Sequence, residues 1–326
     1  MKCTVLVKRL QLQHEASGKI IVFYLEKLIM TTSSICLKKA HRPSVNIVGA
    51  GKVASTLAII WHQSKLINIQ AVWNRNFSAA EYLKNHIPHI QVHKQLETLP
   101  PADIIVIGVS DQFIEEISRK IHQIEWLKAD TLILHFSGAL NSNILIPHNQ
   151  QKLLVGSLHP VFAFASIETA INTLPGHLCA IEGDAEALPL LYKLAQAANL
   201  SYFNIDSAQK NRYHAALSIS ANFLVTLNAF ARNILTSLSL PQELAEALVN
   251  QLMQQNLNQL QIMSPEEALT GPIKRGDSNT IARHWQTLEQ SEQTLYKVLA
   301  KQTLHLTSLS AEKQQQILQI INSQEN

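Results

Sequence analysis

The stretch that decides the fold is Val45-Asn-Ile-Val-Gly-Ala-Gly-Lys-Val-Ala54. It opens with a short apolar run, after which Gly49, Gly51 and Ala54 follow in the spacing GxGxxA. In this spacing the first glycine permits a tight turn and the second lets the backbone approach a pyrophosphate. The alanine lets a helix pack closely on the preceding strand. The stretch therefore predicts a strand, a dinucleotide-binding turn and a helix in succession. A glycine turn without a ligand is the alternative.

Short apolar runs alternate with amphipathic stretches from Ser44 onward. Helical patterns follow the first four runs, and a further helix begins near Asp184. Alternation of this kind predicts an α/β fold with a Rossmann-like, doubly wound parallel sheet. The predicted strands are residues 45–48, 69–73, 104–109, 131–136, 153–158, 177–181 and 201–205.

The pattern changes after Asp206, where strand signals stop and only helical periodicity remains. We expect helices over residues 207–238, 241–263, 277–302 and 311–321. The sequence thus predicts a nucleotide-binding domain over 44–206 and a helical substrate and dimerisation domain over 207–326.

Residues 1–43 stand outside this pattern. Their apolar run at 20–25 is interrupted by Glu26 and Lys27, well before the roughly 20 residues that a membrane span requires. A secretory cleavage site is also missing. We predict a dispensable N-terminal extension, with Met30 as an alternative start.

Composition limits the classes of partner. Of 326 residues, 46% are apolar and 16% charged, and the net charge of +3 comes from 27 basic and 24 acidic side chains without a block of one sign. This argues against nucleic acid as a partner. Cys3, Cys36 and Cys179 are too widely spaced for a disulfide framework or a thiolate metal site. We therefore expect a cytoplasmic protein that binds neither membrane nor nucleic acid.

The end of the second predicted strand, Ala71-Val-Trp73-Asn-Arg75, indicates which dinucleotide would bind. NAD sites usually carry an acid there to bind the ribose hydroxyls, and none is present. Asn74 and Arg75 could instead bind a 2'-phosphate through charge-assisted hydrogen bonds, which favours NADP. A solvated surface arginine is the alternative. The predicted cofactor-binding residues are Gly49, Gly51, Lys52, Val53, Ala54, Asn74, Arg75, Val109 and Ser110.

Polar residues follow the later strands, at the edge where open α/β sheets bind ligands. Ser110 and Asp111 either cap a helix or contact the cofactor. Ser137 and Gly138 follow the next strand, and His159 follows the one after that. Ser137, Gly138 and His159 are predicted to contact the substrate.

The helix predicted from Ser207 carries a polar arc. Lys210, His214, Ser218 and Asn222 recur every four residues, which places them within about 120° of one helix surface. The remaining residues are largely apolar, so we expect this helix to be buried and its polar groups to have partners or a catalytic role.

A turn between two later helices, Thr270-Gly-Pro-Ile-Lys-Arg275-Gly-Asp277, supplies further candidates. Arg275 could hold a substrate carboxylate and Asp277 could cap the next helix, although a structural pair of the two is an equal alternative. The histidines at 86, 89 and 93 are interrupted by a proline and lack nearby acids or cysteines, so a loop is expected there and no metal site.

Together these motifs resemble a bacterial family that joins a Rossmann-like half to a helical half long known only as a domain of unknown function. The resemblance covers about residues 44–305. It rests on residues 45–51, 108–111, 135–138, 159–160, 213–216 and 269–277, of which the last run is the most specific. The family is similar in layout to pyrroline-5-carboxylate reductase, ketopantoate reductase and the 6-phosphogluconate dehydrogenase group. The resemblance implies a helical domain like that of 6-phosphogluconate dehydrogenase and a homodimer formed through it.

The resemblance also implies a reaction, the NADP-dependent reduction of a small 2-oxo acid, with 2-dehydropantoate (ketopantoate) as the first candidate in pantothenate biosynthesis. Similar enzymes use a lysine, with an asparagine one turn later, to polarise the carbonyl and supply a proton. Lys210 matches the lysine, but His214 stands in the place of the asparagine, so either could be the donor. Asn222 matches a further catalytic position, although Ala221 departs from the serine expected before it. Imine reduction and nucleotide sensing without turnover are the alternatives.

Overall fold

The computed structural model describes residues 42–146 and 153–323, so the predicted extension lies almost wholly outside the described residues. Two compact units divide the chain, the first ending at Val225 and the second beginning at Thr226. The last strand ends at Asn204 and helices follow. The boundary between the units therefore falls inside a long helix, beyond the end of the predicted nucleotide-binding domain at Asp206.

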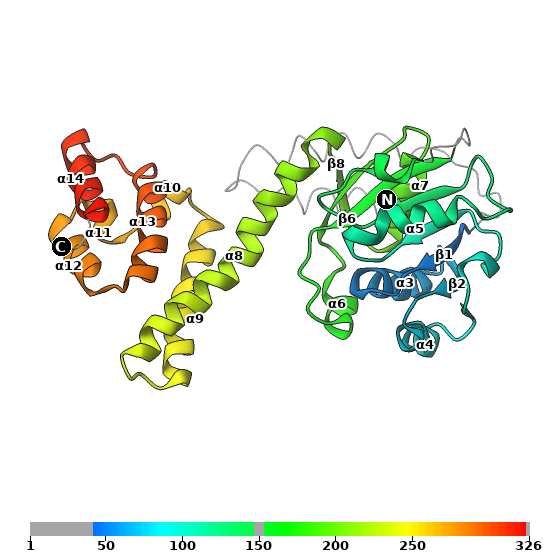
Figure 1. Cartoon of the computed structure of the whole chain (residues 1–326), viewed down its shortest axis with the longest axis horizontal. Coiled ribbons are helices and arrows are strands. Elements are labelled where there is room, and N and C mark those ends of the chain that lie inside the picture. Colours follow the sequence, from blue (N-terminus) through cyan, green and yellow to red (C-terminus); the bar gives the residue numbers. More distant parts are fainter. Residues whose placement is uncertain (1–41, 147–152, 324–326) are drawn as a thin grey trace, which may run out of the picture. The chain divides into compact units, whose positions relative to one another are not determined.

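An eight-stranded sheet in the order β3-β2-β1-β4-β5-β6-β7-β8 forms the centre of the first unit (Figure 1). Its first six positions follow the strand order of a Rossmann fold, which confirms the predicted fold class. Two details differ from expectation, since β7 runs antiparallel to β6 and the short edge strand β3 was not predicted. The strands are Ser44–Val48, Asn68–Trp73, Gln91–His93, Ile104–Ile107, Leu132–His135, Leu154–Pro160, Leu178–Gly183 and Ser201–Asn204.

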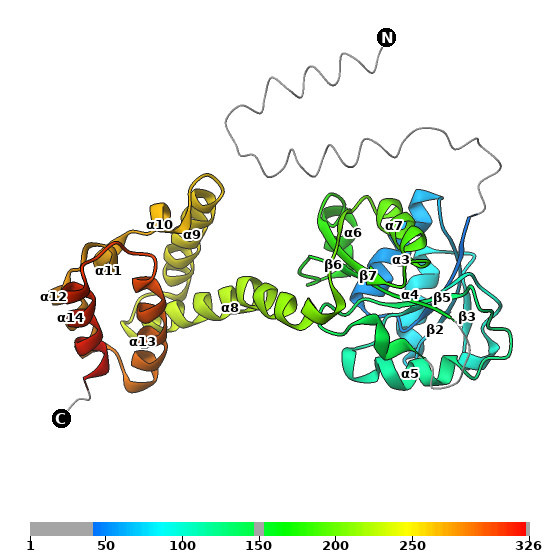
Figure 2. The same cartoon turned by 90° about the horizontal axis from the view of Figure 1, so that it is seen from above.

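Helices cover both faces of the sheet, as Figure 2 shows from above. One face packs on α3 (Lys52–Ser64), α4 (Phe77–His86) and α7 (Leu188–Ala197). The other packs on α5 (Ile114–Ile121) and two short 3-10 turns. Because β4 and β5 are covered on both faces, every residue in them is buried, which explains their unbroken apolar runs.

Two connections differ from the prediction. The helix expected after the fourth predicted strand is replaced, in the described part of that connection, by a 3-10 turn over Ser142–Leu145. An unpredicted helix, α6 (Ile167–Thr173), lies between β6 and β7, where the side chain of Ser166 caps its first turn.

The second unit is helical throughout its described residues. Its core consists of apolar side chains of α12, α13 and α14, among them Ile281 and Trp285. The helix expected over 277–302 is two helices, because Glu289 begins a new capping box with Glu292. The helices are α9 (Gln242–Leu260), α10 (Pro265–Ala268), α11 (Gly271–Arg275), α12 (Ser278–Thr287), α13 (Gln290–Leu304) and α14 (Ala311–Asn322).

Helix α8 (Lys210–Ser237) is the longest element and runs across the boundary between the units. Our expectation that it is buried was wrong, since Lys210 is its only buried residue. Ile219, Phe223 and Val225 are 60%, 56% and 70% exposed. The helix with its preceding turn is long and apolar enough to cross a membrane, but one such helix is weak evidence for a span because core helices of soluble proteins meet the same criterion.

Candidate functional site

The glycine turn after β1 is held by the strands on either side of it. The Gly49 amide donates to the carbonyl oxygen of Trp73 at 2.8 Å. Its backbone has φ +96°, a left-handed conformation that favours glycine, and a Cβ there would stand 2.9 Å from the carbonyl carbon of Gly108. The next amide, that of Ala50, donates to Oδ1 of Asn74 at 3.0 Å. The turn is thus fixed from both β2 and β4.

Helix α3 begins directly after this turn with an open N-terminus. Gly51 is its N-cap residue, and neither a capping side chain nor an acid occupies the first turn. The backbone amides there remain available to an anion and lie at the positive end of the helix dipole. A Cβ on Gly51 would lie 2.9 Å from the carbonyl oxygen of Gly108. Gly108 is confined in turn, because its own Cβ would stand 2.3 Å from that of Ala54.

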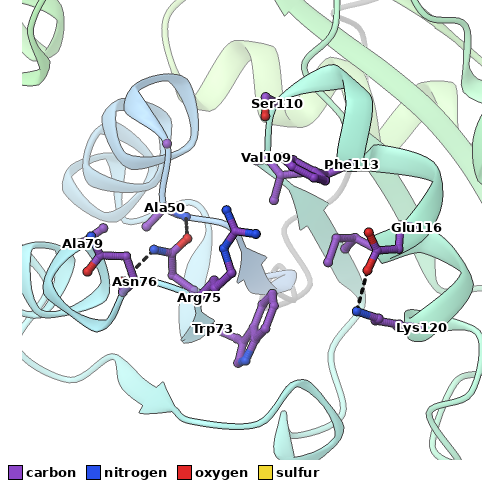
Figure 3. A pocket seen from close by; sticks show the side chains of 14 residues that line it. Ala50, Trp73, Arg75, Asn76, Ala79, Val109, Ser110, Phe113, Glu116 and Lys120 are labelled. Carbon is purple, nitrogen blue, oxygen red and sulfur yellow. Dashed lines mark hydrogen bonds and ion pairs between the residues drawn. The ribbon is translucent and has the colours of Figure 1, made fainter.

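A pocket of about 400 Å³ opens beside this helix end (Figure 3). Figure 3 shows the Arg75 side chain pointing into it, and the guanidinium lies 5.3 Å from the ring centroid of Phe113, a cation–π contact. The lining includes five of the predicted cofactor residues: Gly51, Asn74, Arg75, Val109 and Ser110.

The other predicted cofactor residues do not line the pocket. Ala54 is buried against Gly108. Val53 packs on the core of the sheet. The ammonium of Lys52 donates to the carbonyl oxygen of Ala165 at 2.7 Å.

Sequence reasoning missed several residues of this pocket, including Trp73, Phe113 and Glu116. Phe113 lies in a 3-10 turn (Asp111–Phe113) three residues after Ser110, and only the contact with Arg75 reveals its role. Glu116 is the one carboxylate in the lining, and Lys120 pairs with it at 2.7 Å. The pocket therefore offers open amides and the Arg75 guanidinium, which is stacked on Phe113, and its one acid is paired with Lys120.

These features fit a dinucleotide. A Cβ at Gly49 or Gly51 would collide with the carbonyl group of Gly108, so this close turn requires glycine, and α3 presents bare amides directly after it. Asn74 cannot bind ribose hydroxyls as an acid would, because its oxygen accepts from Ala50 and its nitrogen donates to the carbonyl of Asn76. At the end of β2, the guanidinium of Arg75 can therefore bind a phosphate.

A second pocket of about 470 Å³, also within the first unit, lies between the segment after β6 and the start of α8. His159 contributes from β6, and His214, Ser218 and Asn222 contribute from one side of α8. The two imidazole rings stand 6.0 Å apart at 70°. Gly138 lies against both, because a Cβ there would come within 2.6 Å of His214 and 2.7 Å of His159.

Lys210, the fourth member of the predicted polar arc, is buried away from this pocket and is 1% exposed. Its ammonium contacts the carbonyl oxygen of Ser137 at 3.0 Å, the hydroxyl of Ser157 at 2.5 Å and the carboxylate of Glu182 at 3.5 Å. Glu182 in turn accepts hydrogen bonds from Ser142, Ser157 and Ser207. Burial lowers the pKa of Lys210, with the charge of Glu182 opposing the shift.

The other strand-end residues are tied into the same region. Ser137 donates its hydroxyl to Asp111 at 2.6 Å, so this acid anchors the turn after β5 instead of capping a helix. His135 is fully buried, and burial lowers its pKa to about 4. Its Nδ1 lies 3.1 Å from the amide of Ser137, and its Nε2 lies 3.3 Å from the carbonyl oxygen of Asn141.

Arg275 and Asp277 belong to the second unit. Arg275 ends α11, and Asp277 caps α12 by accepting from the amide of Thr280 at 3.1 Å and from its hydroxyl at 2.7 Å. These bonds, with nearby Arg275, hold the pKa of Asp277 below its usual value. The cap suggested by the sequence is therefore present.

Comparison with known protein families adds two matches. A Rossmann-like domain matches residues 30–160, and a domain of unknown function, DUF2520, matches residues 177–303. The chain joins a Rossmann-like domain to a DUF2520 domain. The DUF2520 match begins at β7, so the last two strands of the sheet and the residues of α8 that line the second pocket belong to it. No curated protein matches the chain.

Several solved structures share this fold. A protein from Bacteroides fragilis, provisionally described as an NADP oxidoreductase, has a TM-score of 0.67 and 22% identity over 81% of this chain and 98% of its own. A protein from Thermotoga maritima has a TM-score of 0.61 and 24% identity over 84% and 98%. Pyrroline carboxylate reductase from Plasmodium falciparum, solved with NADP bound, has a TM-score of 0.53 and 11% identity over 82% and 98%. The Rossmann-like and DUF2520 domains thus have the fold of NAD(P)-dependent oxidoreductases.

Proposed function

We propose that this Rossmann-like DUF2520 protein is an NADP-dependent reductase of a small carbonyl acid. The observation that carries the proposal is the pocket beside α3, where bare helix amides, two confined glycines and the Arg75 guanidinium converge. This set suits a pyrophosphate and a 2'-phosphate at once. The NADP described for two proteins of similar fold supports the choice.

The residues that would hold the nucleotide follow from that pocket. The amides of the first turn of α3 would bind the pyrophosphate, and Arg75 on Phe113 would bind the 2'-phosphate. The bound nucleotide would supply a hydride to the substrate carbon. The second pocket, with its two imidazoles and the polar groups of Ser218 and Asn222, would hold the group that is reduced.

For the substrate we propose a 2-oxo acid, with 2-dehydropantoate first because of the resemblance described above. Arg275 is the proposed partner of the carboxylate. Imine reduction is the second candidate, supported by the likeness in fold to pyrroline carboxylate reductase. NADPH oxidation measured against a panel of 2-oxo acids and cyclic imines separates the two. Tight NADPH binding without turnover of either class would support a nucleotide sensor instead.

Cofactor choice gives a first prediction. Arg75→Asp should remove a charge-assisted hydrogen bond of about 1.5–3 kcal/mol, so NADPH should bind about 10- to 150-fold more weakly. NADH should bind no more weakly, because it lacks the 2'-phosphate. Fluorescence titration with both nucleotides measures the effect. Arg119→Asp, which changes an exposed arginine on α5 paired with Glu115, is the control and should leave both affinities unchanged. Equal affinities in Arg75→Asp and the parent would exclude this role.

The exposed apolar residues of α8 lead us to propose a homodimer. Ile219, Phe223 and Val225 expose more than half of their surface, and α9 exposes Leu244, Leu248 and Leu252 as well. Exposed apolar surface of this kind is typical of protein interfaces. We expect sedimentation at micromolar concentration to give a dimer, and Phe223→Lys to shift it toward monomer. A monomeric parent protein would contradict the proposal.

A further inference from the structure

His159, which lines the second pocket, is hydrogen-bonded to Tyr213, a residue to which the resemblance assigns no role. Tyr213, in the first turn of α8, places its hydroxyl 3.0 Å from Nδ1 of His159 on β6. The rings meet edge to face, with centroids 5.8 Å apart at 88°. The Cε1 and Nε2 atoms of the imidazole lie over Gly138, and His159 forms part of the pocket wall.

We propose, on the basis of the proposed reductase function, that Tyr213 supplies the proton for the reduction and that His159 passes it to the substrate. His159 would be the catalytic residue that touches the reacting atom. Tyr213 would act through it, from the side away from the substrate.

The ionisation of both groups is consistent with this direction of transfer. Burial raises the pKa of Tyr213 to about 12, so the phenol keeps its proton at neutral pH. Burial, followed by the charges of His214 and Lys210, lowers the pKa of His159 to about 4, so the imidazole is neutral. A neutral imidazole has one donor and one acceptor nitrogen. When the phenol donates to Nδ1, the hydrogen of His159 must be on Nε2.

The transfer balances without another reactant besides water. After hydride addition the carbonyl oxygen is an alkoxide, which is more basic than a phenolate. The Nε2–H bond of His159 breaks and an O–H bond forms on the substrate, while the Tyr213 O–H bond breaks and its proton moves to Nδ1. His159 ends neutral in its other tautomer. The phenolate of Tyr213, which is partly exposed, then takes a proton from water.

Neighbouring groups are less suitable as donors. Lys210 is buried, and its ammonium is directed at Ser137, Ser157 and Glu182. His135 is also buried, and each of its ring nitrogens already faces a backbone group. His214 lines the pocket beside His159 and is the competing donor that an experiment must test.

The first test needs no substrate. In the parent protein, ¹⁵N NMR of labelled histidine should show His159 with a protonated Nε2 and an unprotonated Nδ1 at neutral pH. His159→Gln assigns the signal. In Tyr213→Phe the Nδ1 resonance should shift, because the hydrogen bond is lost. A protonated Nδ1 in the parent protein would mean that Tyr213 accepts the hydrogen bond, which would overturn the proposal.

The second test uses turnover on whichever compound the panel identifies. Tyr213→Phe should lower kcat by about 10² to 10⁴ with KM and NADPH affinity unchanged. The normal solvent deuterium isotope effect should change in this variant, which a merely structural tyrosine would not cause. Tyr202→Phe removes a hydroxyl from a tyrosine stacked on Tyr192 and is the control, expected to be fully active.

The outcomes are distinguishable. Full activity in Tyr213→Phe combined with a loss of about 10² or more in His214→Asn would make His214 the donor and overturn the proposal. Failure of the parent protein to bind NADPH would refute the proposed function instead, while the tautomer of His159 would still decide the direction of the hydrogen bond.

Discussion

Lys210→Met is expected to destabilise the protein by about 3–5 kcal/mol, because it leaves the carboxylate of Glu182 buried without its cation. Both side chains are almost inaccessible, at 1% and 2% exposure. Burial acts to raise the pKa of Glu182, but the hydrogen bonds from Ser142 and the charge of Lys210 outweigh it, so this pKa lies below its ordinary value. Chemical denaturation at pH 7 measures the loss.

The pH dependence of that loss provides a check. Without Lys210 the pKa of Glu182 should rise above its value in the unfolded chain. The free energy of unfolding of the variant is therefore reduced as long as the carboxylate is charged. The penalty should shrink as the pH falls and Glu182 becomes protonated. Lys210→Met combined with Glu182→Leu should recover much of the stability, because no buried charge remains. Lys120→Met, which breaks an exposed Lys–Glu pair, should leave the unfolding midpoint unchanged. If Lys210→Met alone is as stable as the parent protein, Lys210 and Glu182 are not a buried pair.

Gly51→Val is expected to abolish dinucleotide binding. A Cβ at this position meets the carbonyl oxygen of Gly108 at 2.9 Å, so the turn must move away from β4, and this displaces the amides of α3 that would bind a pyrophosphate. The loss of two charge-assisted hydrogen bonds, at about 1.5–3 kcal/mol each, weakens binding of either nucleotide by about 10² to 10⁴.

Titration with NADPH and NADH, together with circular dichroism, tests this prediction. Gly176→Ala is the control. Its Cβ would meet nothing within 4 Å, and because its φ of +94° makes alanine costly there, circular dichroism must show that this variant is folded. It should bind both nucleotides normally. If Gly51→Val remains folded and binds NADPH as tightly as its parent, the turn is not the phosphate site.

The sequence was sufficient to predict the Rossmann-like sheet, because long apolar runs such as 104–107 are buried on both faces and the GxGxxA spacing marks the first turn. Short elements were missed. Strand β3 has only three residues with polar ends, and α6 spans fewer than two full turns. The break at Glu289 was missed because the periodicity resumes on its far side.

Candidate site residues were harder to predict, because their roles depend on long-range contacts. Periodicity grouped Lys210 with His214, but the lysine faces a carboxylate 28 residues away on β7, a pairing that no local pattern reveals. Phe113 and Tyr213 were not singled out for a role, since each acquires one only beside Arg75 or His159. The expectation that α8 is buried was wrong because an apolar helix can expose its face within a single chain.

The tight contact between Gly108, directly after β4, and Ala54 of helix α3 also limits which substitutions the gene can accept. A Cβ at position 108 would stand 2.3 Å from that of Ala54 and 2.4 Å from the carbonyl oxygen of Gly49. Enlarging either side chain alone is therefore a deleterious step. Gly108→Ala can be tolerated only after Ala54 has been replaced by glycine and the turn at Gly49 has moved. In descendants of this protein the two positions should consequently mutate in a fixed order.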